Sequence, residues 1–156
     1  MSTLNEQLSR HFTLKELTKT TSGLVNQPES PEIAARLATL CREVLEPIRN
    51  HFARPVIIHS GYRCAAVNSA VGGSKSSQHL RGEAADFHVS GYTVYEVARW
   101  ISDNLDYDQV ILEDFLPEHA SSGWVHCSYA RNNRNQDLTK FKNSKKYYPG
   151  LLLKPE

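Results

Sequence analysis

Apolar residues recur at intervals of three and four positions in two stretches of the chain, which predicts two amphipathic helices. The first stretch comprises Ile33, Leu37, Leu40, Val44, Leu45 and Ile48. The second comprises Val94, Val97, Ala98, Ile101 and Leu105. Pro31, directly after Ser30, favours the start of the longer helix, and Pro47 is expected to kink it or to end its regular part.

Two helix starts carry a capping box, in which a threonine is followed three positions later by a glutamate. Thr13 and Glu16 form the first box and predict a short helix. Thr93 and Glu96 form the second, at the start of the later amphipathic helix.

Four short stretches are rich in β-branched, aromatic or alternating apolar residues, which predicts strands. They cover residues 55–60, 84–89, 107–113 and 124–129. Because the connections between the later strands are short, neighbouring strands are expected to pair antiparallel. The pattern as a whole predicts an α+β fold in which an antiparallel sheet packs against helices.

Length and composition fit one folded domain. The chain has 156 residues, of which 40% are hydrophobic and 22% charged, so it can bury a core without disulfides. We expect a single domain over residues 1–130 and a basic C-terminal extension, residues 131–156, that packs on it or trails from it. The extension has seven Lys and Arg residues against two acidic ones, although the whole chain has a net charge of only +1. The extension either favours an anionic polymer as partner or is a solvated, partly mobile C-terminus. Nucleic acid is not expected, because the sequence has neither a recognition helix nor the basic-region signature of DNA-binding proteins.

The three cysteines, Cys41, Cys64 and Cys127, are odd in number and widely spaced, which argues against a disulfide framework. Cys41 is expected in the core, and Cys127 on the strand face opposite to its neighbour His126. No apolar run has the length of a membrane span, and no signal peptide is visible. We therefore expect synthesis in the cytoplasm without a visible signal peptide.

The strongest chemical signal is a histidine and an aspartate seven positions apart. We interpret His79 and Asp86 as two ligands of one zinc ion, and His126 as the third. Three protein ligands leave one position of a tetrahedral zinc for water, as in a catalytic site. Gly82 allows a tight turn between the first two ligands. His88 shares a strand face with Asp86 and is a rival ligand or a partner of one.

These residues, together with three further motifs, resemble a known family. The metal motif reads Ser77-x-His79-x-x-Gly82-x-Ala84-x-Asp86, with Trp124-Val125-His126 later in the chain. The further motifs are Phe12-Thr13-Leu14-Lys15-Glu16-Leu17, Leu45-Glu46-Pro47-Ile48-Arg49 and Ser60-Gly61-Tyr62-Arg63. Over roughly residues 11–130 the chain resembles the small, phage-type branch of the zinc D-Ala-D-Ala carboxypeptidase and L-Ala-D-Glu endopeptidase family. That family includes vancomycin-resistance dipeptidases, bacteriophage endolysins and structural relatives of the hedgehog signalling domain.

The resemblance implies a hedgehog-like fold, Zn²⁺ bound by the three ligands above, and roles for residues around them. Arg63 is implied to hold a substrate carboxylate or carbonyl near the metal, which suits the geometry of a guanidinium. Ser77 and Gln78, directly before the first ligand, are implied to contact the substrate or to orient the loop.

The general base departs from the family pattern. Many family members carry an acidic residue three positions before the last histidine, where this chain has Gly123. Glu113 is the best replacement, because a strand ending there and paired antiparallel with residues 124–129 would place its carboxylate beside the metal site. Asp114, Glu118 and His119 remain alternatives.

The implied function is a zinc metallopeptidase that hydrolyses a peptide bond in the stem peptide of bacterial peptidoglycan. It would act as a D-Ala-D-Ala carboxypeptidase or as an endolysin-type endopeptidase, with Glu113 and Arg63 as catalytic residues. We expect a monomer that reaches the cell wall after release from the cell or as a virion component. The alternative is a hedgehog-like module that keeps zinc and binds the cell wall without turnover, which Gly123 favours.

Overall fold

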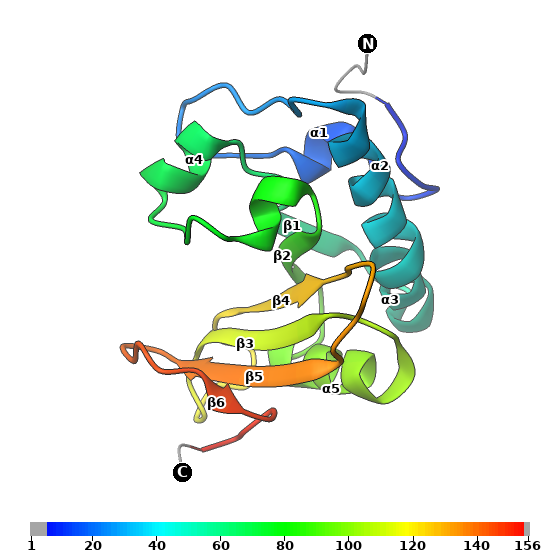
Figure 1. Ribbon diagram of the computed structural model, residues 1–156. Coiled ribbons are helices and arrows are strands. Elements are labelled where there is room, and N and C mark those ends of the chain that lie inside the picture. Colours follow the sequence, from blue (N-terminus) through cyan, green and yellow to red (C-terminus); the bar gives the residue numbers. More distant parts are fainter. Residues whose placement is uncertain (1–5, 155–156) are drawn as a thin grey trace.

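The computed structural model describes residues 6–154 and shows a six-stranded sheet packed against helices (Figure 1). The helices are α1 (Leu14–Leu17), α2 (Pro31–Leu40), α3 (Glu46–Phe52), α4 (Ala65–Ala70) and α5 (Val94–Asn104), with a π-helical segment η1 (Cys41–Leu45) and a 3₁₀ segment η2 (Gln78–Arg81). The strands are β1 (Val56–Ser60), β2 (Ala84–Val89), β3 (Gln109–Phe115), β4 (Trp124–Ser128), β5 (Gln136–Phe141) and β6 (Tyr148–Pro149). The α+β class expected from the sequence is confirmed.

Capping boxes and prolines mark the starts of three helices. Both capping boxes are present, at the start of α1 and of α5. The long helix runs through α2, η1 and α3, and its regular hydrogen bonding is interrupted at η1, just before Pro47. The wider turn is explained by the missing N–H of that proline, since the Glu46 amide bonds to the Cys41 carbonyl five residues back. Within residues 6–154, no helix has the length and apolarity needed to span a bilayer.

The strand order is β1-β2-β4-β3-β5-β6, and the sheet is mixed. The expected antiparallel pairing holds from β1 to β3, but β5 runs parallel to β3. Residues 129–135 carry the chain from the end of β4 past the start of β3, so β5 begins beside Gln109 and follows the direction of β3. The sheet is therefore not purely antiparallel, because the segment after residue 130 adds two strands to it.

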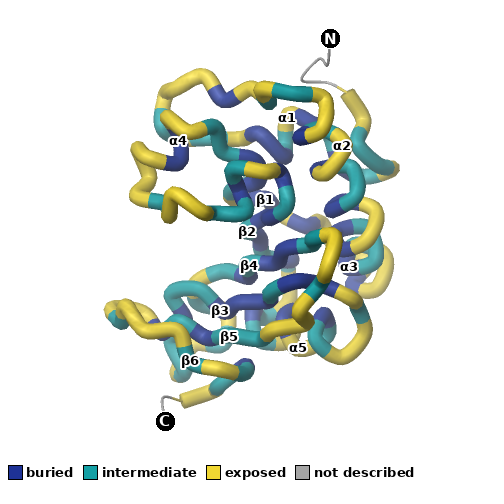
Figure 2. The backbone as a smooth tube through the Cα atoms, viewed as in Figure 1, coloured by how far each residue is buried: buried dark blue, intermediate teal, exposed yellow. Residues whose placement is uncertain are grey.

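One face of the sheet forms the core and the other faces a cleft. Side chains on the core face, such as Phe87, Leu112, Val125 and Cys127, are fully buried, and α5 contacts β2, β3 and β4. Figure 2 shows this buried layer running through the strands and the helices that cover them. Alternate residues of the same strands point to the opposite face, where the candidate site lies.

Candidate metal centre and active site

Three neighbouring elements bring His79, Asp86 and His126 together. His79 lies in η2, and Asp86 and His126 are directly opposite each other on the paired strands β2 and β4. Asp86 Oδ2 is 3.3 Å from His79 Nε2, and Asp86 Oδ1 is 2.9 Å from His126 Nδ1. One ligand atom from each residue lies within 4.8 Å of the other two, and in residues 6–154 no other group of three His, Cys, Asp or Glu side chains does this.

The imidazole of His79 is held in one orientation by a backbone carbonyl. Its Nδ1 is 2.7 Å from the carbonyl oxygen of Gly61, which can only accept a hydrogen bond. Nδ1 therefore carries the proton of the neutral ring, and Nε2 presents a lone pair toward Asp86. A second partner of this kind commonly fixes the tautomer of a metal-binding histidine. Two imidazoles and one carboxylate are also the donor types that zinc prefers, so the residues fit this metal.

The three side chains are largely removed from solvent. The exposed fractions are 3% for His79, 13% for Asp86 and 12% for His126. Burial by itself raises the pKa of Asp86, but the positive charges and hydrogen bonds that His79 and His126 supply when protonated outweigh it and hold this pKa well below the usual range of an aspartate. The Asp86 carboxylate is therefore charged at neutral pH and suited to a cation.

Gly82 forms the turn between the first two ligands. It ends η2 with φ of +75°, where its N–H bonds back to that helical turn. A Cβ atom at this position would lie 2.8 Å from the backbone oxygen of Ile33, so a larger residue would push the turn away from α2.

His88 is not part of this group. Its Nδ1 is 2.7 Å from Nε2 of His59 on the neighbouring strand β1, and neither ring lines the cleft. His59 is the extra residue at the bulge of β1 between Ile58 and Ser60, which brings its ring beside His88.

The three candidate ligands lie in a cleft of about 1040 Å³ whose walls come from three parts of the chain. The sheet face supplies one wall, and residues 71–78 between α4 and η2 supply another. The third comes from the segment after residue 129, including Arg131, Lys140 and Tyr147. Figure 1 shows α4 and the turn before β6 on the same side of the molecule, with the strand edges between them.

Arg63 and Ser77 lie together beside the ligands. Ser77 Oγ accepts hydrogen bonds from the backbone N–H of His79, at 3.2 Å, and from Nη2 of Arg63, at 3.4 Å. Two donors lining the cleft, Nε of Arg63 and Nε1 of Trp124, are buried and have no partner among residues 6–154. Both nitrogens have almost no accessible surface, so a substrate in the cleft would meet other atoms of these two side chains first.

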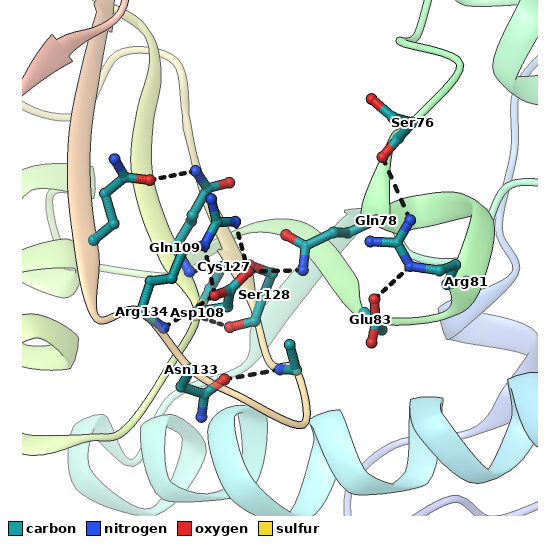
Figure 3. Close-up of polar contacts among 12 residues, drawn as sticks. Ser76, Gln78, Arg81, Glu83, Asp108, Gln109, Cys127, Ser128, Asn133 and Arg134 are labelled. Atoms are coloured by element: carbon teal, nitrogen blue, oxygen red, sulfur yellow. Dashed lines mark hydrogen bonds and ion pairs between the residues drawn. The ribbon is translucent and has the colours of Figure 1, made fainter.

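Gln78 is tied to the opposite side of the cleft. Its Nε2 donates to Oδ2 of Asp108 at 2.9 Å, and Arg134 binds both carboxylate oxygens of the same aspartate at 2.9 and 2.8 Å (Figure 3). Asp108 is only 3% exposed, and these contacts hold its pKa below the usual range, with the Arg134 side chain as the main cause. The amide nitrogen of Gln78 thus bridges η2 to the start of β3, whereas its amide oxygen has no hydrogen-bond partner among residues 6–154.

Glu113 faces the cleft from β3. The predicted antiparallel pairing of this strand with residues 124–129 is confirmed, and Glu113 is opposite Trp124, two residues from His126. Burial raises the pKa of Glu113 above its usual value, and the negative charges of Asp86 and Asp114 add to this rise. A raised pKa brings the carboxylate closer to the value at which a general base works well at neutral pH.

Gly123 passes so close to β3 that no side chain fits. Its φ is +67°, and a Cβ atom would lie 1.9 Å from the backbone oxygen of Glu113. An acidic residue is therefore excluded here by the same backbone approach that places Glu113 at the site.

The other acid–base candidates are placed less favourably. Asp114 lines the cleft but forms an ion pair with Lys140 at 3.0 Å. Glu118 and His119 lie in the loop after β3 and are exposed, and neither lines the cleft.

The contribution of Tyr147, whose hydroxyl is 3.4 Å from Oε1 of Glu113, was missed by sequence reasoning. Its only signal was an aromatic residue within a basic segment, which says nothing about the fold of that segment. Trp124 was noted as part of a motif but not as a buried donor.

A family model described as Peptidase M15 matches residues 9–128, well over half of the chain. The matched region includes all three candidate ligands, Arg63 and Glu113, but ends before the C-terminal wall of the cleft. A search of curated proteins gave no significant match.

Proposed function

This chain belongs to the peptidase M15 family, and on that premise we propose that it is a zinc-dependent peptidase acting on the stem peptide of bacterial peptidoglycan. Family membership makes it a metallopeptidase, while the metal, the substrate and the bond that is cut belong to the proposal. The observation that carries it is the cluster of His79, Asp86 and His126 on the floor of an accessible cleft.

The proposed reaction divides the work between the ligands and two other residues. A zinc ion held by the three ligands would polarise the scissile carbonyl and make an attacking water more acidic. The donor atoms of these ligands are held in place from outside the metal site. Strand pairing fixes Asp86 and His126, and the Gly61 carbonyl fixes the ring of His79.

Glu113 and Arg63 supply the proton transfer and the charge stabilisation. The Glu113 carboxylate takes a proton from water as the new C–O bond forms, and returns a proton to the amine as the C–N bond breaks. Arg63, which lines the cleft, donates from its guanidinium to the carbonyl oxygen as negative charge develops there. Ser77 keeps the guanidinium beside the first ligand through its hydrogen bond to Nη2.

Cell-wall peptide is the proposed substrate because it presents free carboxylates to a cleft lined by Arg63 and Arg131, which form no ion pair among residues 6–154. The protein would then act at the cell wall, as a carboxypeptidase that releases a terminal D-Ala or as an endopeptidase that cuts within the stem. Mass spectrometry of muropeptides after digestion of purified peptidoglycan separates these outcomes, since each leaves a different new terminus.

The decisive test combines turnover with metal content. We expect a chelator to abolish muropeptide release and zinc to restore it. His79→Ala should lose both bound zinc and at least about a hundredfold of the activity, with an unchanged circular dichroism spectrum. His88→Ala is the matched control and should keep both. Full activity in His79→Ala, or indifference to the chelator, would sink the proposal.

The alternative of a binding module without turnover rested on Gly123 in place of the usual acid, and the structure offers another reason for that glycine. Gly123 replaces the usual acid because a side chain would collide with β3, and Glu113 occupies the cleft from that same strand. A pure binding module would retain peptidoglycan and release no new amino termini, so the same assay distinguishes the two.

A further inference from the structure

The segment after residue 130 reaches back over the proposed active site. β5 lies beside β3, and β6 pairs antiparallel with β5 through Leu138 opposite Pro149 and Thr139 opposite Tyr148. The turn that joins them places Tyr147 in the wall of the cleft. This tyrosine lies outside the family match, which ends at residue 128.

Two consecutive tyrosines point in different directions here. Tyr148 packs its ring against Phe141, with ring centroids 5.6 Å apart, and does not line the cleft. The Tyr147 hydroxyl instead lies 3.4 Å from Oε1 of Glu113. Partial burial, with the charge of Glu113 next, raises the pKa of Tyr147 to about 12. The phenol is therefore protonated at neutral pH and donates its hydrogen to the carboxylate.

We propose that Tyr147 is a positioning residue, which holds one oxygen of the Glu113 carboxylate so that the other is turned toward the attacking water. The inference rests on the proposed function of Glu113 as general base. It extends the active site into the segment beyond the family match. The Glu113 side chain has three rotatable bonds and would otherwise sample several orientations. One hydrogen bond to its carboxylate reduces the number of orientations that it adopts.

The test is Tyr147→Phe, which removes only the hydroxyl, with Tyr148→Phe as the matched control. The Tyr148 hydroxyl has no hydrogen bond among the described residues, so its removal should leave turnover unchanged. Since the Tyr147 hydrogen bond is long, we expect kcat to fall by about three- to tenfold with an unchanged KM. An unchanged kcat in Tyr147→Phe, or an equal loss in both variants, would overturn the inference.

A double-mutant cycle separates positioning from general support of the fold. Glu113→Asp withdraws the carboxylate by one methylene, out of reach of Tyr147, and keeps an acid for residual turnover. Adding Tyr147→Phe to this variant should cost nothing further, whereas a purely structural role would lower kcat again by the same factor. Absence of muropeptide release by the unaltered protein would instead count against the proposed function itself, and the inference would fall with it.

Discussion

At the scale of single residues, hydrogen bonds determine which ring nitrogen each candidate ligand presents. The Gly61 carbonyl turns Nε2 of His79 inward, whereas His126 presents Nδ1 to Asp86. The two histidines thus use different nitrogens, although their residue type is the same. The close passage of Gly123 over the Glu113 backbone belongs to the same scale, because one hydrogen in place of a methyl group decides whether the strands can meet.

We predict that Gly123→Ala destabilises the fold by at least about 2 kcal/mol, since it adds a collision to a strained positive φ. Denaturant unfolding measures this loss. Gly72→Ala is the control, because Gly72 has a similar φ of +73° but nothing within 4 Å of an added Cβ. Equal losses in both variants would mean that backbone strain alone matters at position 123.

The residue types at the site could be predicted from the sequence, but their orientations could not. The spacing of His79 and Asp86 indicates a shared metal, and the fold brings both together with His126. Which nitrogen of each ring faces inward depends on carbonyls and strand register that are distant in the sequence. The roles of Arg63 and Glu113 stay predictions until variants are assayed.

At the scale of elements, strongly patterned segments were predictable and weakly patterned ones were not. Capping boxes marked α1 and α5, and the pairing of β3 with β4 followed from their short connection. β5 was missed because its sequence, Gln136 to Phe141, has little apolar alternation and lies in a region dominated by basic charge. Its place in the sheet is set by long-range pairing with β3, which a local pattern does not reveal.

The contact between η2 and the start of β3 gives a prediction at this scale. Asp108→Asn should lower the free energy of unfolding at neutral pH by about 2 kcal/mol, because a buried carboxylate loses its charged hydrogen bonds to Arg134. Asp106→Asn, at an exposed position nearby, should change it little.

The difference in unfolding free energy between the unaltered protein and Asp108→Asn should depend on pH in a defined direction. The pKa of Asp108 is lower in the folded protein than the value of about 3.9 expected in the unfolded chain. Its contribution to stability is therefore complete above that value and is lost as the pH falls through the folded pKa. Unfolding curves of the two proteins should converge below about pH 4, and a constant difference down to about pH 2 would contradict this account.

At the scale of the whole molecule, the cleft depends on segments that are far apart in the sequence. Residues near position 63, residues 71–86, the two central strands and the turn before β6 all contribute to its walls. The C-terminal segment matters here through packing as well as charge, because Phe141 is 5% exposed and lies against Phe115.

We predict that a chain ending at residue 130 is poorly soluble or unfolded. It would lose β5, which would expose the long edge of β3 and part of the core. Soluble yield and circular dichroism measure the effect. Lys142→Gln with Lys145→Gln removes two exposed charges and keeps the strand, and this variant should fold normally. A soluble, folded short chain would show that the sheet is complete without the segment.

The crossing of Gly123 over Glu113 also has a consequence for recognising active relatives. With Glu113 as the proposed general base, a search pattern that demands an acid three positions before the last histidine would wrongly classify this chain as inactive. In this chain the two strands meet so closely that position 123 admits glycine and excludes the acid. A better criterion asks whether a carboxylate stands at either of two positions: position 123, just before Trp124, or position 113, opposite Trp124 on β3.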